Sequence, residues 1–260
     1  DFNTLFRELQ KRGIPILASA ILFLEHHDKT TIHEDINWAI DLAPDYLQFM
    51  QLGPIPGTAL YENYDKKGLI LEDVPYMEQH GQDKIWFKHK YFTREESHDY
   101  LKMAFQRDYQ ENGASLLRYM KTFLKGDKYM KNHSNYHIKK RRKYMQKMIK
   151  EMRYMLLACK VMSENRQTDR LVSEITDIFN EQYGKSGPLT WAMSAAVLGF
   201  AFKEKLLNKY TGNTKQPSKK IIKYHQDQMA GINENNKTDE NNKEMLPPAE
   251  ICINAENSQL

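Results

Sequence analysis

The hydrophobic pattern first predicts a short α/β segment. Residues 14–24 form a continuous apolar run without helical periodicity, and residues 46–52 form a second run of this kind. Strands that are buried on both faces of a parallel sheet or barrel show this pattern. Helical patterns over residues 2–12 and 31–40 alternate with the two runs. This order of helix, strand, helix and strand predicts a parallel α/β unit.

Helical periodicity dominates the chain after Thr93. The sequence Thr93-Arg94-Glu95-Glu96 is a capping box, and it predicts a helix that ends at Gly113. Further helices are predicted over residues 115–125, 138–162 and 169–182. The longest of them carries a methionine-rich stripe, which favours core packing over an adaptable binding face.

Two later segments have unusual composition. Residues 188–202 are apolar all round but too short to span a bilayer, so a buried helix is expected first and an interfacial helix second. Residues 213–260 are rich in Asn, Lys, Glu and Gln, which predicts a disordered polar tail. The resulting division is an α/β part over residues 1–70, a helical extension over residues 71–212 and the tail. The chain begins inside a helical pattern, which suggests a truncated start.

Charge and cysteine content narrow the function classes. The net charge of +4 is mild, but a basic block covers residues 118–153. A solvated helix face is the favoured interpretation, and contact with nucleic acid or an anionic membrane surface stays open. The two cysteines, Cys159 and Cys252, indicate neither a disulfide framework nor a metal site. With no secretory signal pattern and no apolar run of spanning length, a cytoplasmic location is expected, and membrane association is left open.

Candidate binding residues follow the two predicted strands. Residues 25–28 (Glu-His-His-Asp) and the turn at residues 53–58 (Gly-Pro-Ile-Pro-Gly-Thr) lie where ligands bind in parallel sheets and barrels. The turn has a purely structural alternative, because Pro-Gly segments often only redirect a chain. His80 and His89 match no common metal spacing and are expected to be structural histidines.

An ordered set of motifs resembles the radical S-adenosylmethionine (radical SAM) family. The set comprises Arg12-Gly13-Ile14, the run from Ser19 to Glu25, Pro44-Asp45 with Gln48-Phe49, and the turn at residues 53–58 continued by Ala59-Leu60-Tyr61. It resembles the fifth and sixth strands of that family's partial (β/α)6 TIM-like barrel. Residues 81–87, 92–96 and 104–109 are similar to the C-terminal extension of the cobalamin-binding subgroup, with hopanoid methylases as the most similar type.

The resemblance implies an enzyme fragment whose cofactors are S-adenosylmethionine, a 4Fe-4S iron–sulfur cluster and, in this subgroup, cobalamin. It implies radical chemistry on a small-molecule or lipid-like substrate, with methylation as one outcome and no nucleic-acid partner. The residues that it places around S-adenosylmethionine are Ser19, Leu24, Glu25, Gln51, Leu52, Pro54, Pro56 and Gly57. It names no catalytic residue and no metal ligand in this chain.

The chain departs from the family pattern in its cofactor-binding segments and in the loop after the first predicted strand, and the missing cysteines weigh against activity of this chain alone. The family's Cys-x-x-x-Cys-x-x-Cys loop is not found in the sequence, and the cobalamin domain is not found either. Where many members have Gly-Leu-Pro-Gly-Glu-Thr, residues 23–28 are Phe-Leu-Glu-His-His-Asp. A basic helical module that binds nucleic acid or an anionic membrane is the alternative from another class, and a degenerate scaffold is a third.

Overall fold

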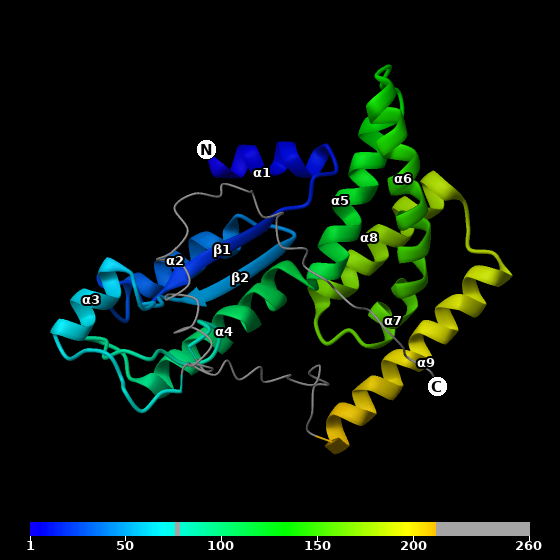
Figure 1. The fold of residues 1–260 in the computed structure, drawn as a ribbon. Helices are drawn as coiled ribbons and strands as arrows, with labels where there is room; N and C mark the ends of the chain where they lie inside the picture. The colour runs from blue at the N-terminus through cyan, green and yellow to red at the C-terminus, as the bar shows by residue number, and fades with distance from the viewer. Residues whose placement is uncertain (76–78, 212–260) are drawn as a thin grey trace, which may run out of the picture. The chain divides into compact units, whose positions relative to one another are not determined.

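The computed structural model describes residues 1–75 and 79–211 (Figure 1). Residues 1–210 form one compact unit. This unit is mostly helical and contains two parallel strands, in agreement with the predicted change from α/β to mostly α. The predicted disordered tail lies outside the described residues.

The α/β part follows the predicted order of elements. Its bounds are α1 (Phe2–Lys11), β1 (Leu17–Leu22), α2 (Thr31–Asp41), β2 (Tyr46–Gln51) and α3 (Ala59–Lys66). The two strands pair in parallel, with Leu17 opposite Tyr46 and Leu22 opposite Gln51. Helix α3 was not predicted, although Thr58 caps it by accepting a hydrogen bond from the Tyr61 N–H at 3.2 Å.

The two faces of this sheet differ in burial. The face that carries Leu22 and Phe49 packs against α2 and α4 (Arg94–Asn112) and forms a closed core. The other face leaves Leu17 64% and Ile21 50% exposed. The prediction that the strands are buried on both faces is therefore wrong for this unit. Among the described residues, Tyr119 reaches the second face at Tyr46, with 5.5 Å between ring centroids, and leaves Leu17 and Ile21 exposed.

Buried Asp45 fixes the sheet to the helices around it. Its Oδ2 accepts hydrogen bonds from the Ile16 N–H at 2.8 Å and the Gln10 amide at 3.3 Å. Its Oδ1 accepts a hydrogen bond from the Thr122 hydroxyl at 2.5 Å. A buried carboxylate is tolerated only when its oxygens are satisfied in this way. The Pro44-Asp45 pair thus joins α1, the residue that precedes β1, and α5 (Ser115–Met130).

A second core lies among the helices that follow. The elements are α5 (Ser115–Met130), α6 (Tyr136–Met152), the 3-10 turn η2 (Arg153–Met155), α7 (Leu156–Val161) and α8 (Arg166–Tyr183). Met145 and Ile149 pack with Ile175 and Phe179, so core packing of the methionine-rich stripe is confirmed. Residues 153–162, which follow α6, were expected to continue one helix.

The single helix predicted over residues 138–162 is wrong, because η2 interrupts it. The Arg153 side chain donates to the Asn180 side-chain oxygen at 2.9 Å and to the Gly184 carbonyl at 2.8 Å. These contacts tie the turn to the end of α8. A hydrophobic repeat close to 3.5 residues does not reveal such a break, because the stripe continues across it.

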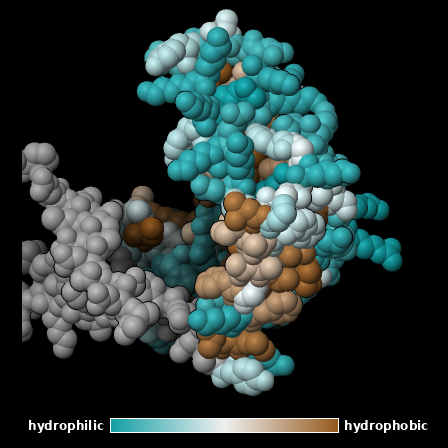
Figure 2. Space-filling model, turned by 90° about the vertical axis from the view of Figure 1, so that its right-hand side faces the viewer, coloured by the Kyte–Doolittle hydropathy of each residue, from teal (hydrophilic) through white to brown (hydrophobic). Residues whose placement is uncertain are grey.

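Helix α9 (Pro188–Thr211) corrects the expectation of a buried helix. Leu189 is 73% exposed and Trp191 is 58% exposed, whereas Ser194 is buried against the rest of the unit. Hydrophobic surface in the lower half of Figure 2 belongs to this region. A helix that is apolar all round has no preferred inner side, so its composition did not determine which side is covered. Among the described residues, no helix has the combination of length and hydrophobicity that crossing a membrane requires.

The described residues of the segment between α3 and α4 contain an isolated antiparallel bridge between Ile70 and Phe87. The predicted capping box is confirmed: Thr93 accepts from the Glu96 N–H at 3.1 Å, and Glu96 accepts from the Thr93 N–H at 2.8 Å.

Candidate functional site

The carboxyl ends of the two strands lie side by side and bring two candidate loops together. Leu22 is opposite Gln51, and the Leu52 N–H donates to the Leu22 carbonyl at 2.8 Å. Residues 23–30 and residues 52–58 therefore leave the sheet at the same edge. Parallel strands place ligand-binding loops at this edge, so the expected location of a site at this edge is geometrically reasonable.

The backbone N–H and the backbone carbonyl of Leu24 both contact histidine side chains. Its N–H donates to His27 Nδ1 at 3.1 Å, and its carbonyl lies 3.1 Å from His89 Nε2. The preceding residue, Phe23, is fully buried and has a φ of 63°. This left-handed conformation is uncommon for a bulky residue. The loop is therefore a fixed turn, with the Leu24 side chain half-buried at its start.

His26, His27 and Asp35 form a compact group of possible metal ligands, with their ligand atoms within 4.8 Å of one another. The hydrogen bonds assign another role to buried His27. Because its Nδ1 accepts from the Leu24 N–H, the proton of the neutral ring lies on Nε2, which donates to Asp35 at 2.8 Å. The Nε2 lone pair is then not available to a metal. We therefore interpret this group as a structural brace for the loop.

Glu25 is exposed and interacts with Tyr64, which lies on α3. Burial, and then the hydrogen-bonded Glu25 carboxylate, raise the pKa of Tyr64 to about 12. The phenol is therefore neutral and donates to the carboxylate across the physiological pH range. This contact orients Glu25 above the strand ends.

The second loop is anchored by Gln51 and Trp86. Gln51 is buried, and its amide donates to the Asp83 carbonyl at 2.8 Å, while its Oε1 has no partner among the described residues. The Trp86 indole N–H donates to the Pro54 carbonyl at 3.2 Å. A Cβ on Gly53 would lie 2.9 Å from the Trp86 ring, so glycine permits this approach.

The remaining predicted residues occupy different surroundings. Leu52 is half-buried, whereas Pro56 and Gly57 are exposed at the tip of the turn, where Gly57 has a φ of 86°. Ser19 lies on the open face of the sheet and donates to the Gln48 side-chain oxygen at 3.2 Å. Ser19 and Gln51 therefore face opposite sides of the sheet and do not meet.

Two residues that support these loops, Tyr64 and Trp86, were not predicted as part of the site, and His27 was predicted only within the candidate segment at residues 25–28. All three are buried. Each acts through a hydrogen bond to a residue far along the chain or to a turn backbone. A histidine or aromatic residue in a polar loop indicates that its side chain anchors the loop. The sequence does not identify the residue that this side chain binds, because that depends on which loops the fold brings together.

The predicted basic block is partly structural. Lys121 pairs with Glu174 at 2.8 Å, Arg142 pairs with Asp127 at 2.8 Å, and Arg141 donates to the Gly13 carbonyl at 3.3 Å. Burial lowers the pKa of Lys125. These contacts reduce the charge that is free to meet a partner surface.

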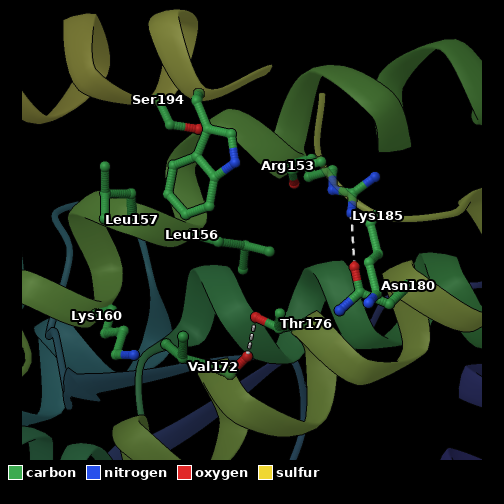
Figure 3. A pocket seen from close by; sticks show the side chains of 11 residues that line it. Arg153, Leu156, Leu157, Lys160, Val172, Thr176, Asn180, Lys185 and Ser194 are labelled. Atoms are coloured by element: carbon green, nitrogen blue, oxygen red, sulfur yellow. Dashed lines mark hydrogen bonds between the residues drawn. The ribbon is translucent and has the colours of Figure 1, made fainter. Parts of the chain in front are cut away.

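A separate cavity lies among α7, α8 and α9 (Figure 3). Its volume is about 360 Å³. Sequence reasoning did not identify it, since its walls come from three helices and a connecting loop. The residues that line it are Arg153, Leu156, Leu157, Lys160, Val172, Thr176, Asn180, Lys185, Ser186, Trp191 and Ser194.

Comparison of the chain with models of known protein families, with curated proteins and with solved structures finds no match.

Proposed function

We propose that this chain is part of a radical SAM enzyme and supplies two adjacent strands of its partial barrel. On this proposal, the loops at the carboxyl ends of β1 and β2 form one wall of the S-adenosylmethionine site. The observation that carries the proposal is the parallel strand pair with one helix-covered face and one open face. The ordered motifs of the sequence lie on these same two strands and their loops.

The open face supports a barrel wall. In an α/β barrel, helices cover the outer face of each strand and the inner face meets other strands' side chains. Here α2 and α4 pack on one face, while Leu17 and Ile21 remain exposed on the other. A two-stranded parallel sheet with an exposed apolar face is not a stable isolated arrangement. Additional strands would cover these side chains.

The backbone at Phe23 also supports the proposal. The family pattern has a glycine at this position, and glycine is the residue that most readily adopts a positive φ. Phe23 has a φ of 63° although it is not glycine. A positive φ at this position is a conformation that a glycine there would adopt without strain. Burial of the Phe23 ring against Phe92, at 5.2 Å between ring centroids, offsets part of the conformational cost.

The types of side chain at the strand ends are suited to binding a nucleoside. Leu24 and Leu52 are partly accessible apolar side chains, and Glu25 offers an exposed carboxylate to a hydroxyl group. Ser19 is placed on the inner face, where it can contact a ligand directly. Gln51 is better suited to hold the loop at residues 79–85, since its amide already binds Asp83. We propose that role for it instead of ligand contact.

The described residues do not fit a 4Fe-4S cluster. Such clusters need several thiolate ligands, and the described residues contain one cysteine, Cys159, whose pKa burial raises. On the proposal, the cluster and cobalamin are held by residues outside this chain. When bound, the cluster would reduce S-adenosylmethionine to start radical chemistry, for which methylation of a lipid-like substrate is one outcome. This chain's own residues would orient the nucleoside and exclude water.

A non-catalytic basic module is the second candidate. It is favoured by exposed lysines on α6, including Lys139, Lys140 and Lys143. The ion pairs of Lys121 and Arg142 weaken it. It also gives no reason for the open sheet face. A role as one wall of a radical SAM barrel accounts for both the open sheet face and the ordered sequence motifs.

The deciding experiment uses the full protein encoded by the reading frame that contains this chain. A Cys-x-x-x-Cys-x-x-Cys motif should be encoded ahead of Asp1. After anaerobic purification and cluster reconstitution, reductant should convert S-adenosylmethionine to 5′-deoxyadenosine. Absence of the motif, or absence of this product from a reconstituted protein, would overturn the proposal.

A pair of variants then tests the strand-end wall. Glu25→Gln should raise the KM for S-adenosylmethionine about tenfold, because a charge-assisted hydrogen bond contributes about 1.5–3 kcal/mol. Glu62→Gln on α3 is the matched control, since it removes the same charge from an exposed helix position. Equal KM values for the two variants would remove Glu25 from the site.

A further inference from the structure

The cavity among α7, α8 and α9 combines apolar walls with cationic side chains. Leu156, Leu157, Val172 and Trp191 supply the apolar part. Arg153, Lys160 and Lys185 supply three cations, and no carboxylate is among the lining residues that the structure describes. A site with this lining is complementary to a ligand that is apolar along its length and negative at one end.

The cations are not neutralised within the described part of the chain. Neither Arg153, Lys160 nor Lys185 makes an ion pair with a described carboxylate. Burial lowers the pKa of Arg153, which shows that its cation is partly removed from water without a compensating negative charge. An anion bound in the cavity would supply that charge.

Arg153 is also held in position before any ligand arrives. One of its terminal nitrogens donates to Asn180 and to the Gly184 carbonyl, and the guanidinium lies 5.4 Å from the centre of the Phe179 ring. Because the side chain is already fixed, little conformational entropy is lost when it binds an anion. Figure 3 shows Arg153, Asn180 and Lys185 together at one end, with Lys160 at the other.

The apolar part of the cavity continues onto the surface of α9. Trp191 lines the cavity and is still 58% exposed, and Leu189 and Met193 next to it are exposed as well. An alkyl chain that enters the cavity could cover part of this surface. The cavity volume of about 360 Å³ falls within the range of roughly 300–1,000 Å³ that is usual for small-molecule sites.

We propose that this cavity binds a single-chain anionic amphiphile of the fatty-acid class. Its carboxylate meets Arg153 and Lys185, and its alkyl chain lies against Leu156, Val172 and Trp191. The inference does not rest on the radical SAM proposal, because it uses none of the residues at the strand ends. It commits to a free fatty acid as the ligand, since the cavity has its own lining from η2, α7, α8 and α9, and a bilayer surface is an outcome of the test.

Tryptophan fluorescence can locate the ligand. The chain has three tryptophans, and Trp38 and Trp86 are outside the cavity lining. We expect 12-bromododecanoate, below its micellar concentration, to quench part of the emission by contact with Trp191. Trp191→Phe should abolish that quenching while calorimetry with dodecanoate still detects binding. Equal quenching of the wild type and Trp191→Phe would overturn the proposal.

Charge variants test the head group. Lys185→Gln should weaken dodecanoate binding about tenfold, because it removes a charged hydrogen-bond partner. Lys203→Gln is the matched control on α9, since Lys203 is exposed and not in the lining. Dodecyltrimethylammonium, with the same chain length and the opposite charge, should not bind at this site.

Three results would contradict the proposal. One is equal loss of affinity in Lys185→Gln and Lys203→Gln, and another is binding of dodecyltrimethylammonium that matches dodecanoate. The third is association with phosphatidylglycerol vesicles without any binding of monomeric dodecanoate, which would assign α9 to a bilayer surface. Circular dichroism of each variant confirms that the fold is retained.

Discussion

At the scale of single residues, His89 links the turn after β1 to the segment that precedes α4. It lies half-buried beside Phe23, Phe87 and Phe92, and its Nε2 is 3.1 Å from the Leu24 carbonyl. Burial lowers its pKa below the ordinary 6.5, and this effect outweighs the opposing hydrogen bond to Leu24. Nearby positive charge, including that of Lys29, lowers the pKa further.

This pKa shift predicts a pH dependence of stability. Because the unfolded chain binds the His89 proton more readily than the folded protein, the free energy of unfolding falls as the pH drops below about 6.5 and stops falling below the folded-state pKa. His89→Gln keeps a hydrogen-bond donor but removes the titration. It should show a smaller loss of stability between pH 7.5 and pH 5.5, measured by urea denaturation.

The control for this experiment is His137→Gln, which changes an exposed histidine at the start of α6. Its pH dependence should follow the wild type. If His89→Gln also follows the wild type, His89 is not responsible for the acid sensitivity.

At the scale of elements, two glycines set how closely α5 approaches the chain after α1. A Cβ on Gly126 would lie 2.4 Å from the Gly13 Cα, and Gly13 itself has a φ of 74°. Such a contact cannot be relieved by rotating a side chain, because the backbone fixes the position of a Cβ and the Gly13 Cα is itself a backbone atom. The close approach therefore needs glycine at both positions.

A matched pair of substitutions tests this close approach. Gly126→Ala should lower the free energy of unfolding by about 1–3 kcal/mol through overpacking, despite alanine's better helix propensity. Gly199→Ala in exposed α9, where a Cβ would meet nothing within 4 Å, should instead raise it by about 0.5–1 kcal/mol. Denaturant unfolding measures both. Stabilisation by both substitutions would show that α5 and Gly13 are not in contact.

The elements that the sequence predicted correctly are those controlled by local chemistry. The Thr93 capping box, the glycine that follows α4 and the strand order around Pro44-Asp45 each depend on nearby residues. The η2 break and the exposure of α9 depend on partners far along the chain, such as Asn180 for Arg153. Hydrophobic periodicity cannot identify those partners.

The candidate site follows the same division. Its position at the strand ends could be predicted, because a parallel pair of strands places the loops after both strands at one edge. The sequence could not show whether Gln51 contacts a ligand or holds a loop in place. Its side chain binds the Asp83 carbonyl, which is 32 residues away along the chain. The Arg153 cavity was missed because its lining is spread over residues 153–194 without a motif.

At the scale of the whole unit, the open sheet face gives Ile21 and Leu22 opposite environments. Ile21 is 50% exposed on the open face, while adjacent Leu22 is completely buried in the core. Successive residues of a strand point to opposite faces. The same charged substitution at the two positions therefore distinguishes an uncovered sheet face from a core.

Ile21→Lys should change the free energy of unfolding by no more than about 0.5 kcal/mol, as for an ordinary surface substitution. Leu22→Lys should cost more than about 4 kcal/mol, because it buries an unpaired charge. The exposed apolar face should also cause the wild-type chain to self-associate, and Ile21→Lys should weaken that association in sedimentation experiments at rising concentration. If Ile21→Lys unfolds the chain as Leu22→Lys does, the face is covered in the chain itself. Two strands of this kind would then need no further barrel strands, and the main support for a radical SAM wall would be lost.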